Sequence, residues 1–180
     1  MRGKEIQLCL ILKKIGRYPD RLTDESLKEK KYPRHQYVQN IIYLLQRCGV
    51  NLGYEFKWLN DMPYSKCLEY VYWDLKSSLD ARYNDHTWYK LNEDEDTKIK
   101  FEACNTVLVN PVSVGISERE WAKFLSAIDY LNKSGNRPYN ITNEDVKEYI
   151  DNLYKDHIDK YDFCYKLAAL RLDNMYAITA

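Results

Sequence analysis

The chain has 180 residues, 45% of them apolar and 30% charged, which is ordinary for a soluble globular protein long enough to bury a core. Its 27 Lys and Arg balance 27 Asp and Glu, so it lacks the strong basic bias of dedicated nucleic-acid-binding proteins. Seventeen tyrosines favour half-buried helix faces and contact surfaces, because a tyrosine packs its ring while its hydroxyl stays in water.

Positive charge is concentrated near the N-terminus. Residues 1–50 hold 11 Lys and Arg against 5 Asp and Glu, whereas 51–100 and 101–180 are each negative by three charges. Two interpretations stay open: a surface that attracts phosphates over a distance, and a solvated, lysine-rich loop. The basic residues concerned are Arg17, Arg21, Lys28, Lys30, Lys31 and Arg34.

The first half of the chain predicts three helices and one strand. One helix ends before Gly16, and a second runs from Pro33 to about Arg47, because apolar residues repeat there at helical spacing. Residues 54–58 alternate aromatic and charged side chains, which predicts a short half-buried strand followed by a Pro-Tyr-Ser turn. Ser65 is then the expected N-cap of a third helix.

The apolar face of this third helix is expected to hold Cys67, Leu68, Val71, Tyr72 and Leu75. Its other residues, among them Glu69, Tyr70 and Trp73, are expected to point away from that face. We therefore expect any function of this helix to lie on its exposed side.

The region from Leu44 to Leu68 resembles the YwgA-type prokaryotic family, which is distantly related to the SocA/Panacea antitoxin domain. The shared pattern is Leu-Leu-Gln, then Leu-Gly-Tyr-aromatic-x-Trp, then Gly-Pro-Tyr-Ser, and Met62 stands here in place of the Gly. The resemblance implies a fold more than an activity. The matching residues are Leu44, Leu45, Gln46, Leu52, Gly53, Tyr54, Phe56, Trp58, Pro63, Tyr64, Ser65 and Leu68.

A second hairpin is predicted after the third helix. Residues 87–91 and 97–101 alternate in polarity and flank the acidic tip 92–96, so they read as the wing of a winged-helix domain. The acidic tip also suggests a Ca²⁺ or Mg²⁺ site, but it lacks the Gly and the distal Glu of an EF-hand loop, which favours a solvated tip.

The rest of the chain predicts a helical unit. Residues 102–116 read as an extended connector, and three helices follow, capped by Ser117, capped by Thr142, and starting at about Asp159. The expected fold class is thus mainly α with some β (α+β). It combines a winged-helix-like domain at 1–110, bearing a β-hairpin wing, with a C-terminal three-helix subdomain at 111–180.

Neither an enzyme nor a cofactor-binding protein is indicated. The chain has no Gly-rich phosphate loop, no Gly-x-Ser-x-Gly and no His-Glu-x-x-His, although a site assembled only by folding stays open. Its five cysteines form no Cys-x-x-Cys pair, and its three histidines lack partners at zinc-site spacing. We expect no catalytic residue, metal or cofactor, and a reduced, cytoplasmic protein without a leader or a membrane span.

The sequence therefore favours a protein-interaction module of antitoxin or defence-associated type. The alternative is a winged-helix DNA-binding regulator that uses 65–76 as its recognition helix. We expect a protein partner, with DNA as the alternative ligand and a homodimer left open. The expected partner-binding residues are Trp58, Tyr64, Lys66, Tyr70 and Trp73, and the candidate phosphate contacts are Lys57, Lys66, Arg17, Arg21, Lys30, Lys31 and Arg34.

Overall fold

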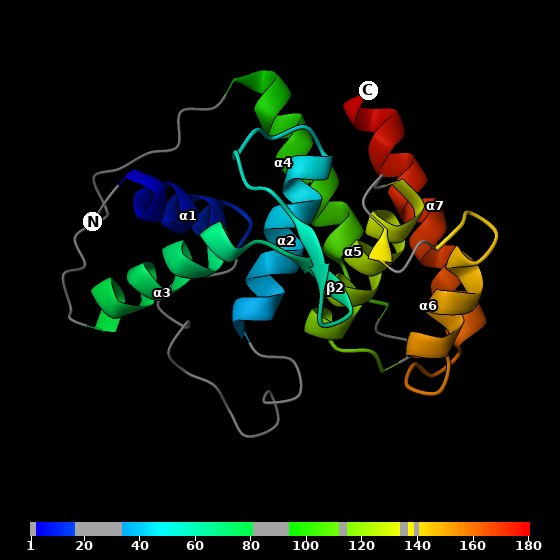
Figure 1. Ribbon diagram of the computed structural model, residues 1–180. Coiled ribbons are helices and arrows are strands. Elements are labelled where there is room, and N and C mark those ends of the chain that lie inside the picture. Colours follow the sequence, from blue (N-terminus) through cyan, green and yellow to red (C-terminus); the bar gives the residue numbers. More distant parts are fainter. Residues whose placement is uncertain (1–2, 17–33, 81–93, 112–114, 134–136, 139–140) are drawn as a thin grey trace.

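The computed structural model describes residues 3–16, 34–80, 94–111, 115–133, 137–138 and 141–180. Within these residues the chain forms seven helices and one two-stranded antiparallel sheet, so the fold is mainly helical (Figure 1). The elements are α1 (Gly3–Lys14), α2 (Arg34–Arg47), β1 (Lys57–Leu59), β2 (Met62–Tyr64), α3 (Lys66–Asp80), α4 (Glu95–Leu108), α5 (Glu118–Lys133), α6 (Val146–Tyr154) and α7 (Tyr161–Thr179).

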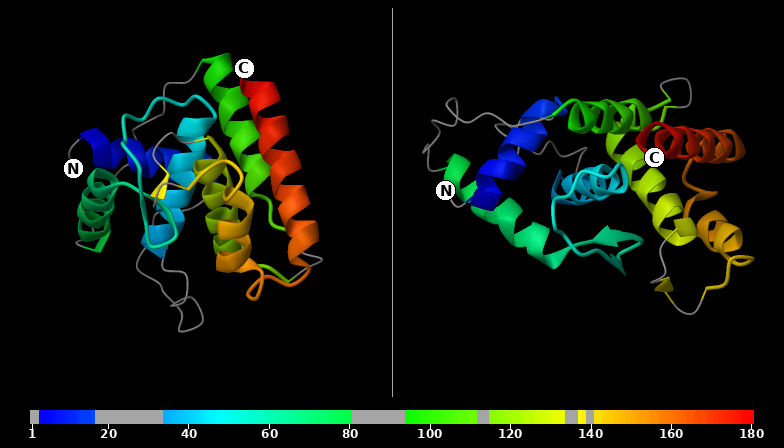
Figure 2. Two further views of the ribbon diagram at one scale, coloured as in Figure 1. Left: turned by 45° about the vertical axis from the view of Figure 1, so that its right-hand side comes forward. Right: turned by 90° about the horizontal axis from the view of Figure 1, so that it is seen from above.

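Helix α2 runs through the centre of the molecule, and the other elements are arranged around it (Figure 2). Every residue from 37 to 45 is buried, so α2 is covered on all sides. Two of these residues, Gln39 and Asn40, are polar, and each is hydrogen-bonded inside the fold: Gln39 to Ser65, and Asn40 to the hydroxyl of Ser126 at 2.8 Å. These bonds offset the cost of burying the two amide groups.

The short hairpin of β1 and β2 differs from the expected strand and turn. Leu59 pairs with Met62, and the two-residue turn is Asn60–Asp61 rather than Pro-Tyr-Ser. Both turn residues have positive φ, 52° and 58°, as a type I′ hairpin turn requires. Pro63 lies opposite Trp58, in the pair next to the one that closes the turn, where antiparallel strands exchange no hydrogen bonds. A proline can therefore occupy this strand.

The predicted wing is wrong in its second strand. Residues 97–101 belong to α4, as does much of the expected connector, while 87–91 lie outside the described residues. Asp94 caps this helix by accepting a hydrogen bond from the Thr97 amide at 2.8 Å. Glu95 and Asp96 occupy the first turn, where negative charge is favoured by the helix dipole. The acidic run is thus a helix start, not a hairpin tip.

The three C-terminal helices are present, with one corrected start. Ser117 caps α5 as predicted, accepting a hydrogen bond from the Glu120 amide at 3.2 Å. Thr142 does not cap α6, which begins only at Val146. Its hydroxyl instead donates to the Asp145 carboxylate at 2.7 Å, so Thr142 stabilises the turn that precedes the helix.

Core residues from the two halves of the chain belong to one hydrophobic cluster. Helix α5 packs against α2, and α4 packs against α7 (Figure 2). Trp121 of α5 is fully buried and donates from Nε1 to the carbonyl of Val107 in α4 at 3.0 Å. The C-terminal helices therefore complete the core around α2, and the hairpin rests on the surface of α2 and α5.

Candidate functional site

A pocket of about 610 Å³ lies between the segment 53–59 and the start of α3, and we call it the hairpin pocket. Both walls come from one continuous stretch of chain, which passes through the hairpin and returns as the first turn of α3. The pocket is lined by Gly53, Glu55, Lys57, Trp58, Leu59, Tyr64, Ser65, Lys66 and Cys67.

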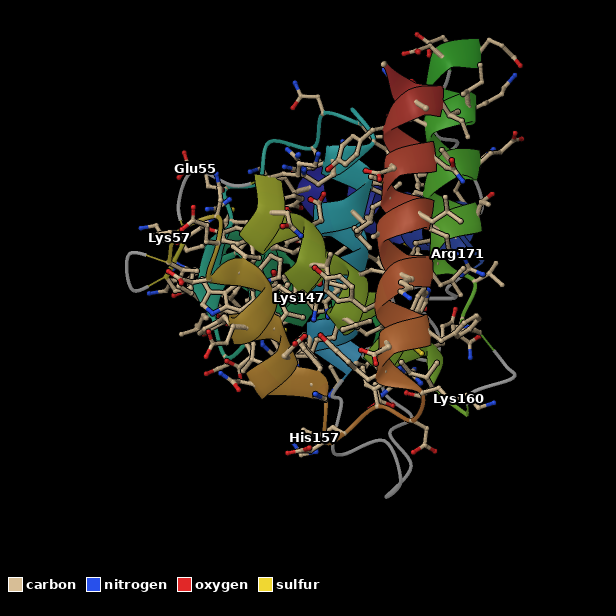
Figure 3. All side chains as sticks on the ribbon, turned by 90° about the vertical axis from the view of Figure 1, so that its right-hand side faces the viewer. Glu55, Lys57, Lys147, His157, Lys160 and Arg171 are labelled. Carbon is tan, nitrogen blue, oxygen red and sulfur yellow. The ribbon has the colours of Figure 1, made fainter. Side chains whose placement is uncertain are left out.

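The wall formed by residues 51–59 alternates between core and solvent. Its even-numbered side chains, from Leu52 to Trp58, are buried or half-buried, and its odd-numbered residues are exposed. Successive side chains of an extended chain point to opposite faces, so the odd-numbered residues are the ones open to a ligand. Figure 3 shows two of them, Glu55 and Lys57, together at one edge of the molecule, away from Arg171 on α7.

The other wall is held by a reciprocal contact between α2 and the start of α3. The Ser65 amide donates to Gln39 Oε1 at 2.8 Å, and Gln39 Nε2 donates to the Ser65 carbonyl at 2.9 Å. Ser65 Oγ accepts from the Leu68 amide at 3.4 Å, which confirms Ser65 as the N-cap of α3. The buried glutamine thereby fixes where the first turn of α3 lies relative to the central helix.

An aromatic stripe continues from the pocket along the outside of α3. Lys66, Tyr70 and Trp73 are spaced four and three residues apart, so they share one helix face. Tyr70 is 58% exposed and Trp73 is 42% exposed. The ammonium of Lys66 lies 5.8 Å from the Tyr70 ring centroid, and that of Lys76 lies 5.4 Å from the Trp73 ring centroid. We call Lys66, Tyr70 and Trp73 the α3 stripe.

The predicted partner-binding residues are therefore neighbours on one surface. Trp58, Tyr64 and Lys66 line the hairpin pocket, and Tyr70 and Trp73 extend it along α3. Trp58 is only half-buried in this arrangement. Its ring packs 5.5 Å from that of Tyr130 in α5, which anchors the hairpin to the core.

Only two of the candidate phosphate contacts are shown to lie on one surface. Lys57 and Lys66 line the hairpin pocket together, whereas Arg34 is half-buried at the start of α2. The remaining candidates lie outside the described residues: Arg17, Arg21, Lys30 and Lys31.

Tyr64 is held in place at the pocket by Glu69. Its hydroxyl donates a hydrogen bond to the Glu69 carboxylate. Burial and this bond raise the pKa of Tyr64 to about 12, so the hydroxyl stays protonated at ordinary pH. Tyr64 therefore presents a neutral, oriented ring to the pocket.

Cys67 is exposed, contrary to its expected place on the apolar face of α3. The buried stripe of α3 is Leu68, Val71, Tyr72 and Leu75. A helix turns about 100° per residue, so Cys67 lies at the edge of this stripe, about 40° from Val71, and this edge faces solvent. The Cys67 thiol lines the hairpin pocket, with the ammonium of Lys4 from α1 at 3.8 Å from its sulfur.

Sequence reasoning missed a second polar centre, built around the buried carboxylate of Asp129. This residue is 1% exposed and accepts hydrogen bonds from Tyr43 Oη at 2.6 Å, from Arg47 Nε at 2.9 Å and from the hydroxyl of Tyr176. One signal was available in the sequence: Asp129 follows Leu125 by four residues and therefore lies on the apolar face of α5, where an acidic residue is unusual. Its partners in α2 and α7 are too distant in sequence to be recognised.

Burial and the Asp129 charge keep both tyrosines of this centre protonated. Burial raises the pKa of Tyr43 well above its ordinary value, and Asp129 raises it further. The same two causes raise the pKa of Tyr176. Both hydroxyls therefore remain donors to the carboxylate, while Arg47 balances its charge.

The described residues contain neither a metal-binding cluster nor a membrane-spanning helix. No group of three or more His, Cys, Asp and Glu side chains there is arranged to hold a metal ion. None of the described helices combines the length and apolarity that a membrane span needs.

No protein-family model, no curated protein and no solved structure matches the chain. Function must therefore be inferred from the surfaces and pockets of the molecule.

Proposed function

We propose that this chain is a non-enzymatic protein-interaction module of antitoxin or defence-associated type. It binds a partner protein through the hairpin pocket and the α3 stripe. The observation that supports this best is the continuity of the two surfaces: Lys66 belongs to both, and Tyr70 and Trp73 extend the pocket by two further helical turns.

The composition of this surface suits a protein partner. Tyr and Trp are enriched at the energetic centres of protein interfaces, and they contribute most where they become fully covered. Tyr70 and Trp73 both keep a large part of their rings in water in the free chain. Lysine ammonium groups beside these rings add favourable contacts that strengthen once water is excluded.

A DNA-binding regulator is the alternative function, and the charges of the described residues favour it less. Glu69 and Asp74 lie on α3 among the residues that would face a DNA groove, and both would repel phosphates. The segment expected as a wing instead begins α4 with two acids in its first turn.

The test uses the purified product of the neighbouring gene as the partner, with affinity measured by calorimetry. Tyr70→Ala combined with Trp73→Ala should weaken binding by about 2 kcal/mol or more, because two central rings are lost. Phe163→Ala is the matched control, since this ring is 51% exposed but lies on α7. Lys57→Ala with Lys66→Ala should cost less than loss of the two rings, about 0.5–1 kcal/mol, because the contact between Lys66 and the Tyr70 ring is lost while the rings stay in place.

Salt separates the two functions. A DNA complex with about six phosphate contacts should lose about 10³ in affinity between 50 and 200 mM salt, whereas an aromatic protein interface should respond weakly. Steep, salt-sensitive binding to duplex DNA that survives both aromatic substitutions would contradict the proposal. Equal losses for the double variant and for Phe163→Ala would also contradict it.

A further inference from the structure

A second pocket, of about 370 Å³, lies on the other side of the segment that walls the hairpin pocket. Even-numbered residues of that segment, Tyr54 and Phe56, face it, together with Tyr130 of α5. Two cationic side chains also line it, Arg47 from α2 and Lys133 from α5. We call this the Arg47 pocket.

The guanidinium of Arg47 is oriented from behind by the Asp129 centre. Its Nε donates both to the Asp129 carboxylate at 2.9 Å and to Tyr176 Oη at 3.0 Å. Arg47 is 36% exposed while Asp129 is 1% exposed, so one edge of the guanidinium faces the core and the rest reaches the surface. Asp129 is thus a positioning residue for Arg47.

Two groups of hydrogen-bond donors remain at the pocket. Across the part of the chain that the structure describes, the Nη atoms of Arg47 and the Nζ of Lys133 make no hydrogen bond to protein. Both cations lie near the Tyr176 ring, at 5.4 and 5.5 Å from its centroid. Asp129 pairs with Arg47, and both charged residues in the pocket lining are cationic.

The walls around these donors are aromatic and neutral. None of the described residues that line the pocket is acidic, so no carboxylate among them would repel an anion. The rings of Phe56 and Tyr43 contact each other edge to face at 5.3 Å, which braces this wall against α2. Flat apolar rings beside paired cationic donors favour a ligand with both an anionic and an apolar part.

From this geometry we infer that the Arg47 pocket binds a small organic anion, whose phosphate or carboxylate meets Arg47 and Lys133 while its planar body lies against the half-buried ring of Phe56. This site is additional to the partner surface, because the two pockets share no lining residue.

The probes are phenyl phosphate, benzoate, inorganic phosphate and the neutral benzyl alcohol, titrated into the full chain by calorimetry. Phenyl phosphate and benzoate should bind saturably with a dissociation constant in the millimolar range or tighter. Inorganic phosphate should bind more weakly than phenyl phosphate because it lacks the apolar body. Benzyl alcohol should bind weakest because it lacks the charge.

Lys133→Gln should weaken the binding of phenyl phosphate about tenfold, as expected for loss of one charge-assisted hydrogen bond. Lys166→Gln is the matched control: it removes an exposed lysine on α7, and it should leave the affinity within about twofold. Arg47→Lys keeps a charge beside Asp129 but removes the forked Nη edge, so it should also weaken binding about tenfold or more. Thermal unfolding of each variant checks that it is folded.

Three results would overturn the inference. The first is the absence of saturable binding of either aromatic anion to the unaltered chain. The second is an equal loss for Lys133→Gln and Lys166→Gln, which would indicate attraction by overall charge. The third is unchanged affinity in Arg47→Lys. If Arg47→Lys does not fold, Lys133→Gln with its control still decides the matter.

Discussion

Asp129 is the residue on which most of the buried polar chemistry of this molecule converges. Its carboxylate accepts three hydrogen bonds, from two helices other than its own. A buried charge is costly unless it is paired and fully hydrogen-bonded, and here Arg47 supplies the opposite charge. The same pairing orients Arg47 toward its pocket, so stability and the inferred anion site depend on one side chain.

Tyr43→Phe should lower the free energy of unfolding by about 1.5–3 kcal/mol, because it removes a hydrogen bond to a buried charge and leaves the ring in place. Urea denaturation measures the change. Tyr70→Phe is the control: its hydroxyl belongs to an exposed residue, so the loss should stay within about 0.5 kcal/mol. A similar small loss for Tyr43→Phe would show that the Tyr43 hydroxyl contributes little to the Asp129 centre.

In the hairpin and in α4, a few neighbouring residues decide whether the chain forms a turn, a strand or a helix. Residues 97–101 alternate in polarity, but Phe101, Cys104 and Leu108 also repeat at three and four residues, and it is this helical set that is buried. Ion pairs of Glu95 with Lys98 and of Asp96 with Lys100 fit the same helix. In the hairpin, the local signal is the turn: Asn60 and Asp61 both adopt positive φ, and this places the turn between β1 and β2.

Asp61→Gly should raise the free energy of unfolding by about 0.5–1 kcal/mol, since glycine adopts positive φ without the strain of a side chain and Asn-Gly is a favoured type I′ pair. Asp61→Ala is the matched control, because it removes the same carboxylate but keeps the strained backbone. Urea titrations of the two variants should therefore differ in favour of glycine. Equal stability would show that turn strain is not significant here.

The molecule as a whole is organised around α2, which the N-terminal and C-terminal elements cover together (Figure 2). Ile41, Leu44 and Leu45 of α2 are fully buried, as are Trp121 and Phe124 of α5. Helix α5 contacts α2 and β2, so it shields both the central helix and the hairpin that forms the partner surface. Stability of the partner surface should thus depend on the C-terminal helices.

A fragment of residues 1–110 should fail to fold cooperatively, because it lacks α5 and would expose the side of α2 that α5 covers. Circular dichroism during urea titration should show no sharp transition, and backbone amides of α2 should exchange quickly with solvent. A cooperative transition in this fragment would support the independent N-terminal domain expected from the sequence, and it would show that α5 is dispensable for the hairpin pocket.

Local signals in the sequence were enough to place α2, α3, α5 and the caps Ser65 and Ser117. They also placed Tyr70 and Trp73 on the exposed side of α3, because helical spacing assigns each residue a face without reference to the rest of the chain. The exposure of Cys67 was missed because this residue lies at the edge of the apolar face of α3. Whether an edge residue is buried depends on which other elements pack against the helix, and helical spacing does not show that. The Asp129 centre was missed because Tyr43 lies 86 residues away in sequence and Arg47 lies 82. Which distant side chains meet depends on how the helices pack around α2, and no local pattern records that arrangement.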